Sequence, residues 1–389
     1  MGRVLAHFRR ITSTGNFVPE IDGLRFAAIA SVVLYHFHGF LLLNKTVPGS
    51  QDSLAAVVEH GYRGVNLFYV ISGFVLGLPL AERYLKGAPG VPLRLYFLRR
   101  LTRLEPPYII NLLICTVLLL LVEGTAARAL LPHLAASLVY LHTLWFGQQS
   151  TINPVAWTLE VEVQFYCLAP LLGLLFRWPS RLARRAVFIG VILGAGLVQM
   201  AFWNSPDRFR FSIAYAIQFF LAGMLLADIY VVDWGKCPNL HWLWDLAALI
   251  CWPLIFLPGD LAVWAGLPFL MLAACVGAFR GILFRRLFRN PVLITVGGMC
   301  YTIYLFHFQL ITPVLRISRN VHIGNTLDAY FVLQFVIYAL VLLPVSCAYF
   351  AGIERPCMIK DWPQRLIARF RWRASERSEA RAAAANLEK

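Results

Sequence analysis

Apolar runs of about 18 to 22 residues recur along the whole chain, and each contains few charged residues. A helix of that length crosses about 30 Å of hydrocarbon, which is the thickness of a bilayer core. Of the 389 residues, 59% are hydrophobic and only 14% are charged, and a soluble core cannot bury that much apolar surface. The runs therefore predict an all-α, polytopic transmembrane helical bundle.

Short basic segments separate the apolar runs and account for the formal net charge of +15. Such segments favour the cytoplasmic side of a membrane, so topology explains the charge and we expect no nucleic-acid partner. Matching the runs to these segments predicts about ten crossings with both termini cytoplasmic, and it places Arg285, Arg286 and Arg289 inside. The expected spans are 24–44, 65–82, 106–122, one of 130–146 and 154–176, 186–203, 211–232, 242–258, 261–279, 292–315 and 329–352.

The runs 130–146 and 154–176 cannot both cross, because the basic loop after Arg177 would then lie outside. The stretch 153–166 is the weaker of the two, since it holds a proline and two glutamates. We therefore expect a broken or re-entrant segment there, which lines a cavity and does not face lipid.

The chain divides into a cytoplasmic N-terminal segment (1–20), one transmembrane domain (21–356) and a basic cytoplasmic tail (357–389). No cleaved leader is expected, because no apolar stretch or cleavage motif precedes the first span. Eight cysteines are scattered without a Cys-x-x-Cys pair or a histidine at ligand spacing. We expect reduced cysteines and no metal site.

Arg25 and His36 interrupt the first expected span. They are eleven residues apart, which is three helical turns plus about 20°, so they share one face of the helix. The helical rise places His36 about 16 Å beyond Arg25, deep in the bilayer. The pair is either a functional site facing a polar interior, or an arginine reaching the headgroups and a neutral core imidazole. His38 is offset by about 200° from His36, and we expect it to pack elsewhere.

Three further stretches place polar groups in or beside apolar runs. Arg99, Arg100 and Arg103 precede the third expected span, where guanidinium groups either hold phosphates or act as a positive-inside anchor. Glu160 and Glu162 are two residues apart, so on a helix they point to roughly opposite sides. His307 lies alone in an apolar run, where a histidine is more often structural than functional.

Six short segments contain these residues in a fixed order between 21 and 356. They are Ile21-Asp22-Gly23-Leu24-Arg25 with Tyr35-His36; 64–74, which ends in Ser72-Gly73-Phe74; Arg100-Leu101-Thr102-Arg103; Trp157-Thr158-Leu159 with Glu162 and Phe165-Tyr166; Tyr301–His307; and Glu354-Arg355-Pro356. In this order they resemble the bacterial membrane acyltransferase family 3, whose inner-membrane enzymes O-acylate sugars and some natural products. Asn66 stands where the family commonly has an acidic residue, and Cys300 stands where serine is usual.

The resemblance implies an integral membrane acyltransferase of the bacterial inner membrane. It implies an acyl-CoA co-substrate, acetyl-CoA in the first place, and a hydroxyl acceptor on a cell-envelope or exported carbohydrate. Many family members carry an extra periplasmic domain, so the chain is expected to act alone or with a separate periplasmic partner protein. The oligomeric state stays open.

The same resemblance assigns roles to single residues. We expect His36 to act as general base or transient acyl carrier. Arg25 is expected to stabilise an oxyanion or a donor phosphate, and Glu162 to orient an imidazole or bind sugar hydroxyls. Arg99, Arg100 and Arg103 are expected to hold CoA phosphates. The candidate substrate-binding residues are Asp22, Ser72, Trp157, Tyr301 and His307.

Other functions stay open at this point. A polysaccharide or small-molecule transporter or flippase also needs buried charged residues, although no internal repeat is visible in the sequence. Acylation of a glycosylated secondary metabolite is an alternative acceptor chemistry. A non-enzymatic assembly factor for envelope polysaccharide is the third class.

Overall fold

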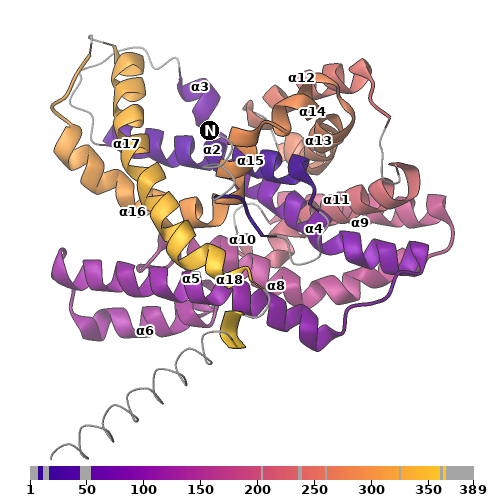
Figure 1. Ribbon diagram of the computed structural model, residues 1–389, viewed down its shortest axis with the longest axis horizontal. Coiled ribbons are helices and arrows are strands. Elements are labelled where there is room, and N and C mark those ends of the chain that lie inside the picture. Colours follow the sequence, from indigo (N-terminus) through magenta and orange to yellow (C-terminus); the bar gives the residue numbers. More distant parts are fainter. Residues whose placement is uncertain are drawn as a thin grey trace, which may run out of the picture.

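The computed structural model describes residues 8–11, 17–43, 54–202, 205–234, 239–258, 261–323, 326–359 and 362–364. Every regular element in this part of the chain is helical, and no strand occurs in it (Figure 1). The longer helices are α2 (Pro19–Leu43), α4 (Gly64–Lys86), α5 (Leu93–Leu121), α8 (Trp157–Leu172), α9 (Arg181–Ala201), α11 (Ile213–Ile229), α12 (Trp242–Phe256), α13 (Leu261–Arg280), α16 (Cys300–Ser318) and α17 (Leu327–Tyr349).

Short elements connect these helices. They are α3 (Ala55–Val58), η1 (Gly61–Arg63), α6 (Ala127–Leu138), α7 (His142–Phe146), η2 (Pro154–Ala156), η3 (Gly173–Arg177), α10 (Asp207–Arg210), η4 (Tyr230–Trp234), α14 (Leu283–Phe288), α15 (Pro291–Gly298), η5 (Phe350–Glu354) and α18 (Arg355–Cys357). In Figure 1, α5 and α6 lie side by side at one edge of the bundle, while α12, α13 and α14 gather at the opposite edge.

Seven helical segments of the described chain are long and apolar enough to cross a membrane, or eight if the bent pair α15 and α16 counts as one span. The polytopic helical bundle is confirmed, but the count of about ten crossings is not. The difference lies in α12 and α13, which occur where two spans are expected. Their described apolar stretches, Trp242–Phe256 and Ala265–Arg280, are each shorter than 18 residues.

The expected break in 153–166 is wrong. η2, α8 and η3 together form a continuous apolar segment, Pro154–Arg177, that is long enough to span. The interruption lies in 130–146 instead, where α6 ends at Leu138 and Tyr140 adopts a left-handed φ of 56° before the five-residue α7. The bundle can hold Glu160 in a span because its carboxylate accepts a hydrogen bond from the Thr143 backbone N–H at 3.0 Å.

A second break separates α15 from α16, whose axes differ by 69°. Met299 stands between them, directly after Gly297 and Gly298. A Cβ on Gly297 would lie 1.8 Å from the Asp22 carbonyl oxygen, so only glycine allows α15 to lie this close to α2. The break aims the first turn of α16 at the N-terminal end of α2.

Glycines also set the centre of the bundle, where α4 crosses α11. A Cβ on Gly73 would lie 2.0 Å from the Phe220 carbonyl oxygen, and one on Gly223 would lie 2.0 Å from the Val70 carbonyl oxygen. Small residues at helix crossings allow this close backbone contact inside a membrane. The stretch 219–228 of α11 is buried as a result.

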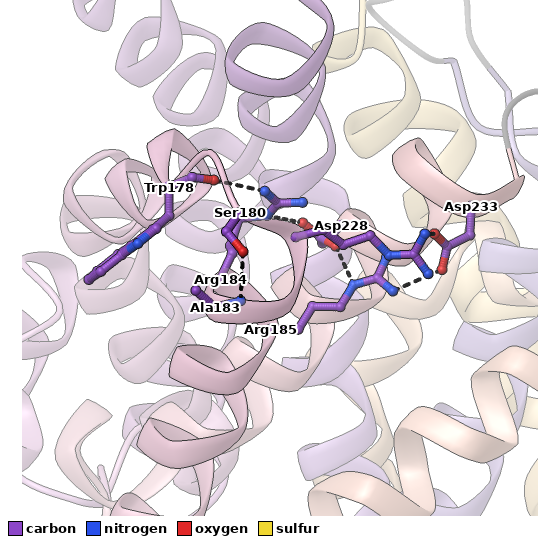
Figure 2. Close-up of polar contacts among 8 residues, drawn as sticks. Trp178, Ser180, Ala183, Arg184, Arg185, Asp228 and Asp233 are labelled. Atoms are coloured by element: carbon purple, nitrogen blue, oxygen red, sulfur yellow. Dashed lines mark hydrogen bonds and ion pairs between the residues drawn. The ribbon is translucent and has the colours of Figure 1, made fainter.

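Ion pairs tie α9 to the end of α11, as Figure 2 shows. The buried Asp228 accepts hydrogen bonds from Arg184 and, at 2.7 Å, from Arg185. Arg185 also pairs with Asp233 at 3.0 Å, and Arg184 donates to the Trp178 carbonyl at 2.8 Å. Part of the basic stretch after Arg177 is therefore used inside the bundle.

Candidate functional site

His36 and His307 meet in the interior of the bundle, from α2 and α16. His36 Nδ1 lies 3.0 Å from His307 Nε2, and the two ring centroids are 5.1 Å apart. His307 is fully buried, whereas His36 is partly exposed. The sequence placed each histidine in the membrane but did not indicate that they touch.

The hydrogen bonds define which nitrogens carry protons. His307 Nδ1 lies 2.8 Å from the Tyr304 carbonyl oxygen, and a carbonyl only accepts, so Nδ1 carries the hydrogen. In a neutral ring the lone pair then lies on Nε2, which accepts from the Nδ1–H of His36. Neutral His36 is left with its lone pair on Nε2. The assignment rests on this bonding pattern.

Two tyrosines hold the His307 segment in place. The Tyr338 hydroxyl on α17 donates to the His307 carbonyl at 2.7 Å. The Tyr304 hydroxyl donates to the Val155 carbonyl at 2.9 Å and accepts from the Thr158 hydroxyl at 2.8 Å. α16 is thereby fixed to α17 on one side and to the start of α8 on the other.

Two buried asparagines support the same segment, and sequence reasoning missed both. The Asn111 and Asn153 side-chain amides donate to the Leu305 carbonyl at 3.2 and 3.3 Å, and Asn153 also donates to the Asn111 side-chain oxygen at 2.9 Å. Both are 0% exposed. An amide in the middle of an apolar run was the signal that could have revealed Asn111.

Asp22 holds two arginines at the start of α2. Its Oδ1 accepts from Arg25 at 2.6 Å and pairs with Arg10 Nε at 3.3 Å. Arg25 therefore turns toward the residue three positions earlier, away from His36. Burial, and then the neighbouring Arg25, lower the pKa of Arg10 to about 9, while Asp22 acts in the opposite direction.

The arginines of the third expected span lie on α5 itself, since this helix begins at Leu93 and not near 106. The Arg100 guanidinium stacks 3.7 Å from the Tyr96 ring centre and 5.4 Å from that of Tyr166. The Nε atoms of Arg99 and Arg103 are buried without a hydrogen-bond partner among the described residues. Arg103 interacts electrostatically with both Arg10 and Arg100, so the groups on α5 and before α2 form one cluster.

Glu162 lies between the arginine cluster and the histidine pair. Its Oε1 accepts from the Ser72 hydroxyl at 2.7 Å, which unites two of the expected site residues. It interacts electrostatically with Arg25 and Arg100 on one side and with Tyr304 on the other. Glu160 points elsewhere, as expected for residues two apart, but it is buried and its carboxylate binds the Thr143 N–H at the start of α7.

Two other expected site residues, Tyr301 and Trp157, and His38, which was expected to pack elsewhere, make contacts within the bundle. The Tyr301 hydroxyl donates to the Leu104 carbonyl at 3.0 Å and so ties α16 to α5. The Trp157 ring packs against Phe211, with centroids 4.6 Å apart. His38 is buried, and its ring centroid lies 5.7 Å from that of Phe331. It therefore packs away from His36, as its helical offset predicts.

The described residues contain no group of three histidine, cysteine, aspartate or glutamate side chains that is arranged to hold a metal ion. The donor set suits an anion better, because several guanidinium groups converge and two of their buried N–H groups are unpaired. A phosphate offers oxygens that accept from arginine in a bidentate manner. The cluster thus fits a phosphate group.

Comparison with known proteins gives a consistent result. A model of the family described as "Acyltransferase domain" matches residues 18–351. The chain is 26% identical over 336 residues to "Putative O-acetyltransferase SACOL0978" of Staphylococcus aureus (strain COL), covering 77% of this chain and 51% of that protein. It is 24% identical over 375 residues to "O-acetyltransferase OatA" of Staphylococcus aureus (strain NCTC 8325 / PS 47), covering 89% of this chain and 58% of that protein.

The chain spans about half the length of the curated relatives it matches. No solved structure matches it. The match to the family model includes both histidines, Asp22, Arg25, Glu162 and the three arginines of α5. The residues that the structure brings together are thus all inside the matched region, except Arg10.

Proposed function

This chain belongs to the acyltransferase domain family, and we propose that it is an O-acetyltransferase that moves an acetyl group from acetyl-CoA to a hydroxyl of an envelope or exported carbohydrate. It is a multi-pass membrane protein, and we place it in the bacterial inner membrane. The family favours bond making over the transport function that buried charges alone leave open. The names of the relatives support O-acetyl transfer, and the family resemblance supports the carbohydrate acceptor.

The observation that carries this proposal is the chain from the Tyr304 carbonyl through His307 to His36. It leaves the lone pair of His36 on Nε2 and fixes the ring. A fixed neutral imidazole is the usual group that removes a proton from a hydroxyl near pH 7. His36 is therefore the general base, and His307 is a positioning residue that sets its tautomer.

The reaction balances with this one base. His36 Nε2 takes the proton of the acceptor hydroxyl as its oxygen bonds to the thioester carbonyl carbon. The tetrahedral intermediate then collapses, the carbon–sulfur bond breaks, and the CoA thiolate takes the proton from the imidazolium. The products are an ester and free CoA, and His36 returns to its neutral state.

The arginine cluster binds the donor in this scheme. Arg99, Arg100 and Arg103 on α5, with Arg10 beside them, provide the guanidinium groups that phosphates need. Helical rise separates Arg25 from His36 by about 16 Å. CoA carries its thioester at the far end of an extended arm from its phosphates, so two centres separated in this way suit it.

Arg25 then belongs to the donor-binding end. Its bond to Asp22 directs the guanidinium toward Arg10 and away from His36. Of its two expected roles, binding a donor phosphate fits this orientation, and stabilising an oxyanion at His36 does not. Asp22 Oδ1 correspondingly orients the two arginines, while Asp22 Oδ2 has no hydrogen-bond partner among the described residues and stays a candidate substrate ligand.

The test is an assay of the purified chain with acetyl-labelled acetyl-CoA and a panel of carbohydrate acceptors. We expect free CoA to form in proportion to label on a carbohydrate hydroxyl. Reactions without acceptor measure hydrolysis. The proposal is contradicted if acetyl-CoA stays intact with every acceptor while the protein moves an unmodified carbohydrate across the membrane of proteoliposomes. That result favours a transporter.

A further inference from the structure

We propose that α14 and the start of α15 form a binding site for the phosphate of an anionic phospholipid in the cytoplasmic leaflet. A cavity of about 450 Å³ is lined by Arg285, Arg286 and Arg289, together with Asn290, Pro291 and two apolar residues, Leu240 and Ile282. The charge pattern predicts that this face is cytoplasmic. The catalytic proposal does not use it.

The charge of the cavity favours an anion. Among the described residues, Glu20 pairs with Arg285 Nε at 3.0 Å and with Arg289 Nε at 3.9 Å, while the second nearby carboxylate, Asp245, binds the Ile282 backbone N–H. Arg286 has no ion-pair partner within the described part of the chain. Three guanidinium groups against two carboxylates, Glu20 and Asp245, leave a net charge of about +1, which matches the single negative charge of a phospholipid phosphodiester.

The helix that presents these arginines is held rigidly. Both side-chain oxygens of Asp245, on α12, accept from the backbone N–H groups at the start of α14, at 2.7 Å from Ile282, 3.0 Å from Leu283 and 2.9 Å from Phe284. At the other end, Phe288 packs closely against Gly23 of α2, since a Cβ on Gly23 would lie 2.1 Å from the Phe288 carbonyl oxygen. The site is thus built into the bundle.

The surroundings identify the ligand as a lipid. Leu283 and Leu287 on α14, and Ile282 directly before it, are exposed, Leu283 to 66%. Exposed apolar side chains next to exposed arginines are typical of a helix at the membrane interface, with apolar groups among acyl chains and guanidinium groups at the phosphates. A soluble phosphate makes no favourable contact with these apolar side chains, whereas the acyl chains of a lipid do.

The cavity is separate from the donor-binding cluster. Glu20 faces α14, whereas Asp22 holds Arg10 and Arg25. These two carboxylates are two residues apart, which places them about 200° apart around α2. The lipid site and the CoA site therefore lie on opposite sides of one helix.

The test titrates the purified full chain in detergent with dioctanoyl phosphatidylglycerol, and with dioctanoyl phosphatidylcholine as the uncharged comparison. Arg286→Gln with Arg289→Gln should weaken phosphatidylglycerol binding by about fivefold for each arginine removed. The matched control is Arg94→Gln with Arg177→Gln, two exposed arginines predicted to face the same side. The melting temperature of every variant shows whether weaker binding is due to loss of the fold. The single variant Arg286→Gln is a second, milder test of binding.

Selective phosphatidylglycerol binding that falls only in the first double variant supports the site. Equal binding in the two double variants overturns it. Displacement of the lipid by the same concentration of inorganic phosphate or CoA also overturns it, because the site then takes soluble phosphates. Acetyl transfer is measured separately, so its loss or retention does not decide this result.

Discussion

At the residue scale, one backbone carbonyl determines the chemistry of His36. The Tyr304 carbonyl requires a proton on His307 Nδ1, and this in turn requires a proton on His36 Nδ1. A lone histidine on a membrane helix has no such preference between its two nitrogens. The second histidine therefore converts a buried imidazole into a base with a defined reactive atom.

Replacing His307 tests this positioning role. His307→Ala should lower turnover and leave the Michaelis constant for acetyl-CoA unchanged, because the donor-binding cluster is intact. His307→Gln should recover part of the activity, since its amide oxygen can still accept from His36 Nδ1–H. Equal activity of the alanine and glutamine variants, at equal melting temperature, would show that His307 only fills space.

Arg103 tests the donor-binding cluster. Its Nε is buried without a hydrogen-bond partner among the residues that the structure describes, so a phosphate would gain a charge-assisted hydrogen bond there. Arg103→Ala should raise the Michaelis constant for acetyl-CoA about tenfold or more. Arg94→Ala, which removes an exposed arginine from the same helix, should leave it unchanged. A lower turnover with an unchanged constant would place the phosphates elsewhere.

Sequence reasoning located the histidines and arginines because ionisable residues in apolar runs are conspicuous. It missed Asn111 and Asn153, which are uncharged. It also did not predict that the Tyr301 hydroxyl donates a hydrogen bond to the Leu104 carbonyl. Arg10 lies outside every apolar run, and only the fold brings it to Asp22. Contacts between distant segments are not visible in the periodicity of one segment.

At the scale of elements, most helices occur where apolar runs predict them, but their ends and breaks differ. α5 begins at Leu93, because Arg99, Arg100 and Arg103 are compatible with a helix although not with a bilayer interior. Glutamates suggested a break in 153–166, yet that helix is intact, and Glu160 Oε2 accepts a hydrogen bond from the Thr143 backbone N–H. The breaks lie instead at Tyr140, between α6 and α7, and after Gly297-Gly298, where close packing and not hydropathy decides.

The crossing of α4 and α11 makes a prediction about stability. Gly223→Ala would place a Cβ 2.0 Å from the Val70 carbonyl oxygen, so the helices must separate. Overpacking of this kind costs about 1 to 3 kcal/mol, and the melting temperature in detergent should fall. The control is Gly190→Ala on α9, where a Cβ meets nothing within 4 Å. Equal melting temperatures of the two variants would contradict this packing.

At the scale of the whole molecule, the proposed function depends on orientation. The donor-binding cluster, the start of α2 and the arginines of α14 occur near one another, through contacts between α2, α14 and α15. The positive-inside pattern predicts that this end faces the cytoplasm, where acetyl-CoA is available. The histidine pair lies deeper, because His36 is three helical turns further along α2 than Arg25.

Labelling from each side of the membrane tests this orientation. Arg286→Cys should react with a membrane-impermeant thiol reagent only in inverted vesicles, and Glu123→Cys, after the far end of α5, only in intact cells. The unsubstituted chain gives the background of the native cysteines. Reaction of both variants from the same side would refute the orientation.

The central claim is that acetyl transfer depends on His36 as the base. The most direct measurement compares the purified chain with His36→Ala, inserted to the same level, in the labelled acetyl-CoA assay. Loss of a general base should lower turnover by about 10² to 10⁴-fold, with binding of acetyl-CoA retained. Transfer that persists within a few-fold of the unsubstituted chain would contradict the account.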